Sequence, residues 1–154
     1  MESHLKSLLE NGTFSGVSAT RSNIMAAVKG KSNLSTEVVL RYALVRAGMS
    51  GWRLHASDIM GKPDFYFDEA RLAVFVDGCF WHGCDRCGHV PKTRSAFWRA
   101  KFDRNKARDI RTTRALRAEG IHVIRLWEHA LKGPEALTRV VSRVREVVAR
   151  RLAS

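Results

Sequence analysis

The sequence lacks any apolar run long enough to span a membrane, and its N-terminus lacks the short apolar core of a signal peptide. We therefore expect a cytoplasmic protein, in a compartment where thiols stay reduced. Cysteine is also scarce, because the chain has only three, all of them within residues 79–87. An odd number of clustered cysteines in a reducing compartment favours a metal site over disulfides.

Acidic residues are few, with 15 Asp and Glu against 27 Lys and Arg, which gives a net charge of +12. A small domain with such a charge most commonly binds nucleic acid. The length of 154 residues, without an internal repeat or a linker, corresponds to one domain. We assign residues 35–154 to that domain and residues 1–34 to a flexible basic arm. The arm is either a solvated tail or a segment that clamps DNA.

Hydrophobic periodicity predicts an α/β protein in which a hairpin is followed by a helical crossover to a further strand. Such a connection gives a mixed sheet with helices packed on it. The predicted elements are a helix that begins near residues 35–36 and is stopped by Gly48, strands at 52–55, 64–67 and 72–76, a helix at 95–119, a strand at 121–127 and a helix from 134.

The cysteines follow the pattern Cys79-x4-Cys84-x2-Cys87, whose second part has the spacing that chelates a tetrahedral zinc ion. Zinc needs a fourth ligand, for which there are three candidates, all of them histidines: His82, His89 and His129. We favour the last of these, because it follows the final predicted strand and would tie the end of the sheet to the cysteine loop.

Asp64 ends the segment Gly-Lys-Pro-Asp at 61–64 and begins a strand of the predicted hairpin. Metal-dependent nucleases place a carboxylate at such a position to hold Mg²⁺ against the scissile phosphate. Magnesium keeps several waters and needs only one or two protein carboxylates. A neighbouring main-chain carbonyl is a candidate second ligand, and Glu37 is placed to assist from the first helix.

In unbroken order over roughly residues 20–133, several motifs resemble those of the very short patch repair (Vsr) endonucleases. They are Gly-Lys-Pro-Asp at 61–64, Asp-Gly-Cys-Phe-Trp-His-Gly-Cys at 77–84, Pro-Lys-Thr-Arg at 91–94, Phe-Trp at 97–98, Asn105 with Arg108 and Asp109, and Trp-Glu-His-Ala-Leu-Lys-Gly at 127–133. The resemblance implies a restriction-endonuclease-like fold of the PD-(D/E)XK class with a structural zinc site. The implied activity is Mg²⁺-dependent nicking of one DNA strand 5′ to a T:G mismatch, which arises when 5-methylcytosine is deaminated.

The resemblance also implies catalytic roles. Asp64 would bind Mg²⁺ together with the main-chain carbonyl of Val76, and Glu37 would be the supporting glutamate. His82 would be the general base that activates the attacking water, with Asp109 as its partner. This role removes His82 from the zinc candidates and strengthens His129.

Three aromatic residues match side chains that the family wedges into the DNA stack beside the mismatch: Phe80, Trp81 and Trp98. Wedging costs about a few kcal/mol per base step, and a mismatch lowers that cost. Ordinary core packing is the alternative for each ring. Lys92 and Arg94 are further candidates for DNA contacts.

Asp77 departs from the family pattern, because some members have histidine there. We expect it to be an additional Mg²⁺ ligand, although it is also explained as a replacement for an auxiliary histidine. Two other functions stay open: a Vsr-like nuclease of restriction or phage defence that cuts without a mismatch, and a non-catalytic, zinc-stabilised DNA-binding module. We expect a monomer that acts on double-stranded DNA at the bacterial nucleoid, with repair or defence proteins as further partners.

Overall fold

The computed structural model describes residues 36–154, so the predicted arm at 1–34 lies outside the described residues. Residues 36–46 are helical. The elements that follow are β1 (Trp52–Leu54), β2 (Phe65–Phe67), β3 (Leu72–Asp77), α3 (Ser95–Ala118), β4 (His122–Trp127), the 3₁₀ helix η2 (Glu128–Leu131) and α4 (Pro134–Leu152). The predicted order of helices and strands is confirmed, with boundaries that shift by one or two residues.

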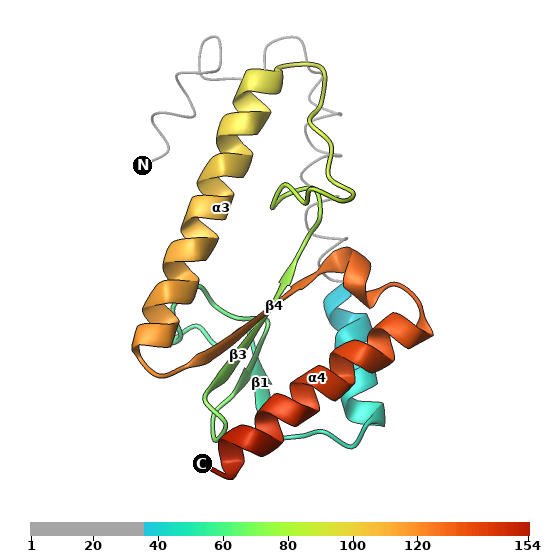
Figure 1. Cartoon of the computed structure of the whole chain (residues 1–154), viewed down its shortest axis with the longest axis vertical. Helices are drawn as coiled ribbons and strands as arrows, with labels where there is room; N and C mark the ends of the chain where they lie inside the picture. Colours follow the sequence, from blue (N-terminus) through green and yellow to red (C-terminus); the bar gives the residue numbers. More distant parts are fainter. Residues whose placement is uncertain (1–35) are drawn as a thin grey trace.

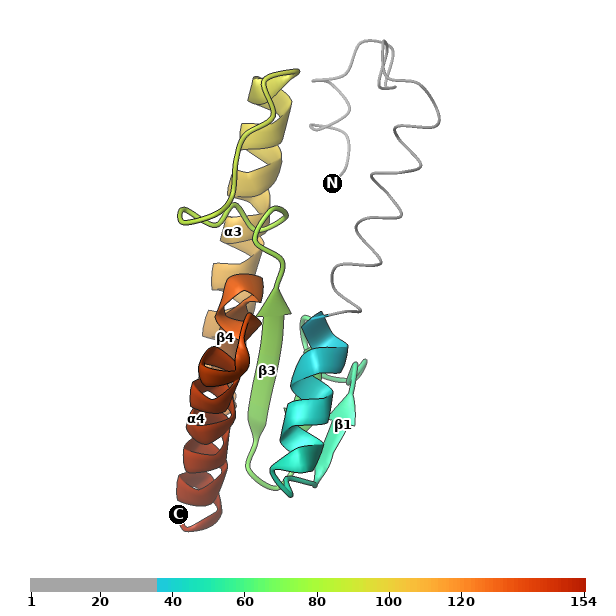
Figure 2. The same ribbon diagram turned by 90° about the vertical axis from the view of Figure 1, so that its right-hand side faces the viewer.

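The four strands form one mixed sheet in the order β1-β2-β3-β4. The first three are antiparallel neighbours, and β4 pairs parallel to β3 after the crossover through α3. The parallel register pairs Leu72 with His122 and Asp77 with Trp127. Both strands therefore end at the same edge of the sheet, from which the loop at 78–94 departs (Figure 2). This arrangement confirms the mixed sheet and is consistent with the Vsr nuclease fold.

Alternation along the strands creates two cores, one on each face of the sheet. On one face, Leu40 and Leu44 of the first helix and the valines of α4 pack on strand residues such as Val74. On the other face, Leu116 of α3 packs on Tyr66, Phe75 and their neighbours. Figure 1 shows α3 on the side of the sheet opposite to α4 and to the helix at 36–46. None of the described helices is long and apolar enough to cross a membrane.

The helix α3 is longer than the sheet on which it packs. Its 24 residues extend over about 36 Å, whereas the six residues of β3 cover about 20 Å. Its buried residues near the N-terminal end are Phe97 and Phe102, far from Leu116 at the other end. The C-terminal part of α3 covers the sheet, and its N-terminal part runs beside the loop at 78–94 (Figure 1). Residues in the middle of α3 therefore lie near the edge where β3 ends.

Candidate active site

Three cysteine sulfurs surround one imidazole nitrogen beyond the ends of β3 and β4. The Sγ atoms of Cys79, Cys84 and Cys87 lie 3.3, 3.6 and 3.4 Å from Nδ1 of His129, and the sulfurs of Cys84 and Cys87 are 3.6 Å apart. In a tetrahedral site with Zn–S bonds of about 2.3 Å and Zn–N bonds of about 2.0 Å, neighbouring donors lie roughly 3.5–3.8 Å apart. The four donors therefore have the chemistry and the spacing that suit one zinc ion.

The other two candidate histidines lie elsewhere. Nδ1 of His82 is directed at the carboxylate of Asp109, and the ring of His89 packs at 5.6 Å from the ring of Phe80. His129, which the sequence analysis favoured, is therefore the candidate histidine that lies with the three cysteines. His129 comes from η2, directly after β4, and the cysteines come from the loop after β3. A metal held there would tie together two segments that are distant in sequence.

The cysteine loop folds tightly on itself. The amide of Cys84 donates to the carbonyl of Cys79 at 2.9 Å, and the amide of Gly88 donates to the carbonyl of Cys84 at 2.7 Å. A Cβ atom at Gly88 would lie 2.4 Å from the carbonyl oxygen of Cys84, so no other residue fits there without movement of the loop. The amide of Cys79 also donates to the Glu128 carboxylate at 3.3 Å. Burial raises the pKa of the Cys79 thiol to about 12, which a bound cation would reverse.

The predicted wedge residues form one aromatic cluster between this loop and α3. Phe80 makes ring contacts with Trp81, Trp98 and Phe102, at centroid distances of 5.0, 5.2 and 5.4 Å. Phe102 is buried, whereas Phe80 and the two tryptophans are only half-buried. The side chain of Asn105 donates to the carbonyl of Trp81 at 2.7 Å and so fixes the loop to α3. The rings are thus packed against each other and still partly accessible.

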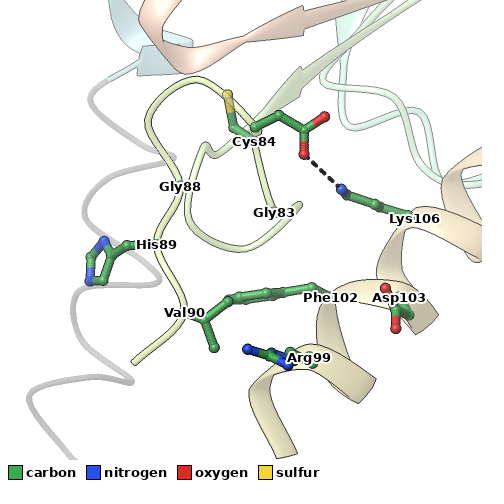
Figure 3. Close-up of a pocket in the computed structure, with 10 residues that line it drawn as sticks. Gly83, Cys84, Gly88, His89, Val90, Arg99, Phe102, Asp103 and Lys106 are labelled. Carbon is green, nitrogen blue, oxygen red and sulfur yellow. Dashed lines mark hydrogen bonds and ion pairs between the residues drawn. The ribbon is translucent and has the colours of Figure 1, made fainter. Parts of the chain in front are cut away.

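Next to this cluster, the loop and α3 enclose a pocket of about 300 Å³. Gly83, Gly88 and His89 line it from the loop, and residues such as Arg99 and Phe102 line it from α3 (Figure 3). An ion pair of 3.2 Å between Lys106 and Asp85 lies at its edge. The predicted DNA contacts Lys92 and Arg94 precede α3, where Lys92 is exposed and Arg94 is half-buried.

A second group of ligand-type side chains lies around Asp64. One carboxylate oxygen of Asp64 accepts a hydrogen bond of 2.6 Å from the amide of Val76, which places the carboxylate beside the end of β3. The carboxylate of Glu37 lies 3.0 Å from Nε2 of His55. One donor atom from each of Glu37, His55 and Asp64 lies within 4.8 Å of the other two. Two carboxylates and an imidazole at this spacing fit a divalent cation.

Neither carboxylate of this group forms an ion pair with an Arg or Lys among the described residues, although the Arg125 charge interacts electrostatically with Asp64. Burial raises the pKa of Asp64 to about 6, the Glu37 charge adds to the increase, and the Val76 amide opposes it. The excess negative charge is what a divalent cation would neutralise.

A third group lies on the other side of the end of β3. Nδ1 of His82 lies 2.5 Å from Oδ2 of Asp109 and 3.7 Å from Oδ1 of Asp77. Arg125, from β4, donates to both oxygens of Asp77 at 2.6 and 2.7 Å and lies 3.1 Å from Oδ1 of Asp109. Burial disfavours the Asp109 anion, but the hydrogen bond with His82 and the Arg125 charge hold the pKa of Asp109 below its usual range. A neutral His82 that donates from Nδ1 would keep Nε2 as a proton acceptor.

Besides the cysteine cluster, the structure brings the predicted residues together in two groups. Asp64, Val76 and Glu37 are neighbours, His82 and Asp109 are paired, and Asp77 belongs with the second set. Both Asp77 oxygens are bound by Arg125, so its contacts favour the replacement of an auxiliary histidine over the expected role as a Mg²⁺ ligand.

Sequence reasoning missed His55 and Arg125. The signal for Arg125 was a charged residue within an apolar strand whose parallel neighbour ends in an aspartate. His55 follows β1, and its amide donates to the carbonyl of Asp64 at 3.2 Å.

The raised pKa of Asp64 predicts a stability effect in the metal-free protein. A carboxyl with a raised folded-state pKa contributes stability below its unfolded pKa near 4, and this contribution is lost as pH rises through about 6. Asp64→Asn keeps an acceptor for the Val76 amide, so it should stabilise the metal-free protein by about 1–3 kcal/mol at pH 8 and have little effect at pH 4. Urea denaturation at both pH values, in buffer that contains no Mg²⁺ and no chelator, measures this difference. An equal effect of Asp64→Asn at pH 4 and pH 8 would contradict the raised pKa of Asp64.

The cysteine cluster predicts one zinc ion per chain. Cys87→Ser removes an exposed ligand, and Gly88→Ala leaves all four ligands but clashes with the carbonyl of Cys84. Both variants should lose zinc and unfold at a lower temperature, as measured by elemental analysis and thermal denaturation. Asp85→Asn, in the same loop, should retain the metal. A metal-free wild-type protein with an unchanged melting temperature would refute the zinc site.

Comparison with known proteins gives a consistent family assignment. Residues 17–89 match the family described as DNA mismatch endonuclease Vsr. The type II nicking enzyme V.XorIIP of Xanthomonas oryzae pv. oryzae is 42% identical over 119 residues, which cover 76% of this chain and 85% of that protein. The DNA mismatch endonuclease Vsr of Escherichia coli K12 is 38% identical over 123 residues, with 78% and 76% covered. The type II nicking enzyme V.NaeI of Lentzea aerocolonigenes is 37% identical over 124 residues, with 77% and 74% covered. The chain therefore belongs to the Vsr family of DNA mismatch endonucleases.

Proposed function

We propose that this protein is a Mg²⁺-dependent endonuclease of the PD-(D/E)XK class that nicks one strand of duplex DNA 5′ to a T:G mismatch. The observation that carries the proposal is the placement of two complementary groups at the end of β3. Asp64 and Glu37 offer oxygen ligands on one side, and His82, oriented by Asp109, offers a base on the other. Phosphodiester hydrolysis needs both a site for a cation and a proton acceptor.

Asp64 and the main-chain carbonyl of Val76 would hold the Mg²⁺ ion, with Glu37 in support. The chemistry that the ion supplies is neutralisation of charge on the scissile phosphate and easier deprotonation of water. His82 accepts the proton of the attacking water at Nε2, while Asp109 holds the ring through Nδ1 and stabilises the imidazolium that forms. The lowered pKa of Asp109 supports this role, because an ionised carboxylate stabilises an imidazolium better than a neutral acid does.

The cysteine cluster would have a structural role. A zinc ion held by Cys79, Cys84, Cys87 and His129 would fix the loop that carries both the base and the wedge aromatics. Phe80, Trp81 and Trp98 would enter the stack beside the mismatch, where unstacking costs less than in matched DNA. Lys92 and Arg94 would contact phosphates, and Lys101, which lies 5.2 Å from the Trp81 ring, adds charge beside the wedge.

A second candidate function is favoured by the names of the relatives. V.XorIIP and V.NaeI are named type II nicking enzymes, so the same site in this chain would serve a restriction system. In that case cleavage could occur without a mismatch. The monomeric state, the action at the bacterial nucleoid and the use of the N-terminal arm on DNA stay predictions.

Nicking assays on labelled duplexes test the proposal. With Mg²⁺ the protein should nick the T strand of a T:G duplex and leave matched and single-stranded DNA intact. Asp64→Ala should abolish nicking, and His82→Ala should slow it by about 10²–10⁴-fold, because each removes one part of the site. Asp103→Asn, an exposed position on α3, is the matched control and should cut like the wild type.

The outcomes separate the candidate functions. Equal cutting of matched and T:G duplexes would favour the restriction role and rule out mismatch dependence. Binding without cleavage of any substrate would reduce the protein to a DNA-binding module. Normal cutting by Asp64→Ala would show that the cation is held elsewhere.

A further inference from the structure

Arg125 is a charged residue between apolar neighbours near the centre of β4. Its side chain is 22% exposed, and its guanidinium lies 4.7 Å from the ring centroid of Phe75, its partner in the parallel register. Burial of a guanidinium is unfavourable unless carboxylates pair with it, and apolar residues often give equal stability at such positions. Packing alone therefore does not require a charged residue at position 125, which indicates that Arg125 has a role in the nearby group of His82 and Asp109.

The contacts of Arg125 divide between two carboxylates that come from different elements. Nε and Nη2 donate to the two oxygens of Asp77, which is 9% exposed and lies at the end of β3. Nη2 also lies 3.1 Å from Oδ1 of Asp109, which comes from α3. Arg125 therefore connects the sheet to the carboxylate on the helix that covers it.

The contact of Arg125 with Asp109 involves one oxygen of that carboxylate and leaves the other for the His82 ring. Oδ1 of Asp109 faces Arg125, and Oδ2 bonds to Nδ1 of His82. Because both oxygens are occupied, the carboxylate cannot rotate without the loss of one contact. Without the guanidinium, Asp77 and Asp109 would be two like charges beside the same ring, and their repulsion would displace the side chain that is less firmly held.

We propose that Arg125 is a positioning residue for the nicking reaction: anchored on Asp77, it fixes the Asp109 carboxylate that orients the base His82. This inference rests on the proposed function and deepens it. With neutral His82 the four side chains carry one net negative charge, and proton uptake by the ring brings the group to neutrality. Asp77 would then help to position His82 through Arg125 and Asp109. The cation would be bound by Asp64 and Val76, with Glu37 in support.

The test uses the full-length protein and the variants Arg125→Gln, Arg125→Lys, Asp77→Asn and the double variant Asp77→Asn with Arg125→Gln. Single-turnover nicking of a T:G duplex at saturating enzyme measures the chemical step, and fluorescence anisotropy in Ca²⁺ measures DNA binding. Arg125→Gln should slow nicking by about 10–100-fold, with the Kd for DNA changed less than about twofold. Arg125→Lys should be faster than Arg125→Gln but slower than the wild type, because lysine keeps the positive charge but cannot donate two parallel hydrogen bonds to a carboxylate.

Two comparisons separate positioning from general stability. The double variant should be no slower than Arg125→Gln, because residues that act as a unit give non-additive losses. Arg108→Gln is the matched control: this exposed arginine lies 3.8 Å from Asp109, and its loss should change the saturated rate by less than about twofold.

A spectroscopic measurement distinguishes failure of this inference from failure of the proposed function. Nitrogen NMR of His82 should show a proton on Nδ1 in the wild type and loss or exchange broadening of that signal in Arg125→Gln, whether or not the protein cuts DNA. Wild-type rate and an unchanged Nδ1 proton in a folded Arg125→Gln would overturn the inference. Failure of both variants to fold would also overturn it, since the role would then be structural.

Discussion

The parallel pairing of β3 with β4 is the constraint on which every group of the site depends. It ends both strands at one edge of the sheet and pairs Asp77 with Trp127. Cys79 follows Asp77 by two residues, and His129 follows Trp127 by two residues, so the pairing brings the four donors of the cysteine cluster together. The same register places Arg125 within reach of Asp77. A slip of one residue would turn every side chain of β4 to the other face. It would separate His129 from the cysteines and Arg125 from Asp77.

The two groups proposed to be catalytic at this edge differ in how their charge is balanced. Around Asp64 the carboxylates form no ion pair with an Arg or Lys among the described residues, and burial raises the pKa of Asp64 to about 6. Around Asp109 the half-buried Arg125 supplies the balance, and the pKa of Asp109 is lowered. Environments that push two carboxyl groups in opposite directions are typical of sites that divide their tasks. One group is suited to receive a cation and the other to stay ionised beside an imidazole.

Much of this arrangement could be predicted from the sequence, because it depends on local patterns. Alternation and turn residues predicted the strands, and cysteine spacing predicted three of the four donors of the cysteine cluster. The contact of Arg125 with Asp77 could not be predicted, because it depends on the register between two strands and joins residues 48 positions apart. The contact of His55 with Glu37 could not be predicted either, because it depends on how the first helix packs beside the end of β1. The expected Mg²⁺ role of Asp77 was reasoned from its place after β3, without knowledge of the partner on β4. The rings of Phe80, Trp81 and Trp98 are packed against each other and still partly exposed. DNA wedging and core packing are alternatives in the sequence-based prediction, which did not consider that both could hold.

The central claim is that the structural and catalytic metals occupy separate sites. Anomalous diffraction from crystals soaked in Mn²⁺, with data at the zinc and manganese absorption edges, tests it most directly. Our account predicts a zinc peak enclosed by Cys79, Cys84, Cys87 and His129, and a separate manganese peak at Asp64 and the carbonyl of Val76. Manganese bound by Asp77 and His82 with none at Asp64, or zinc at Asp64 and none at the cysteines, would contradict it.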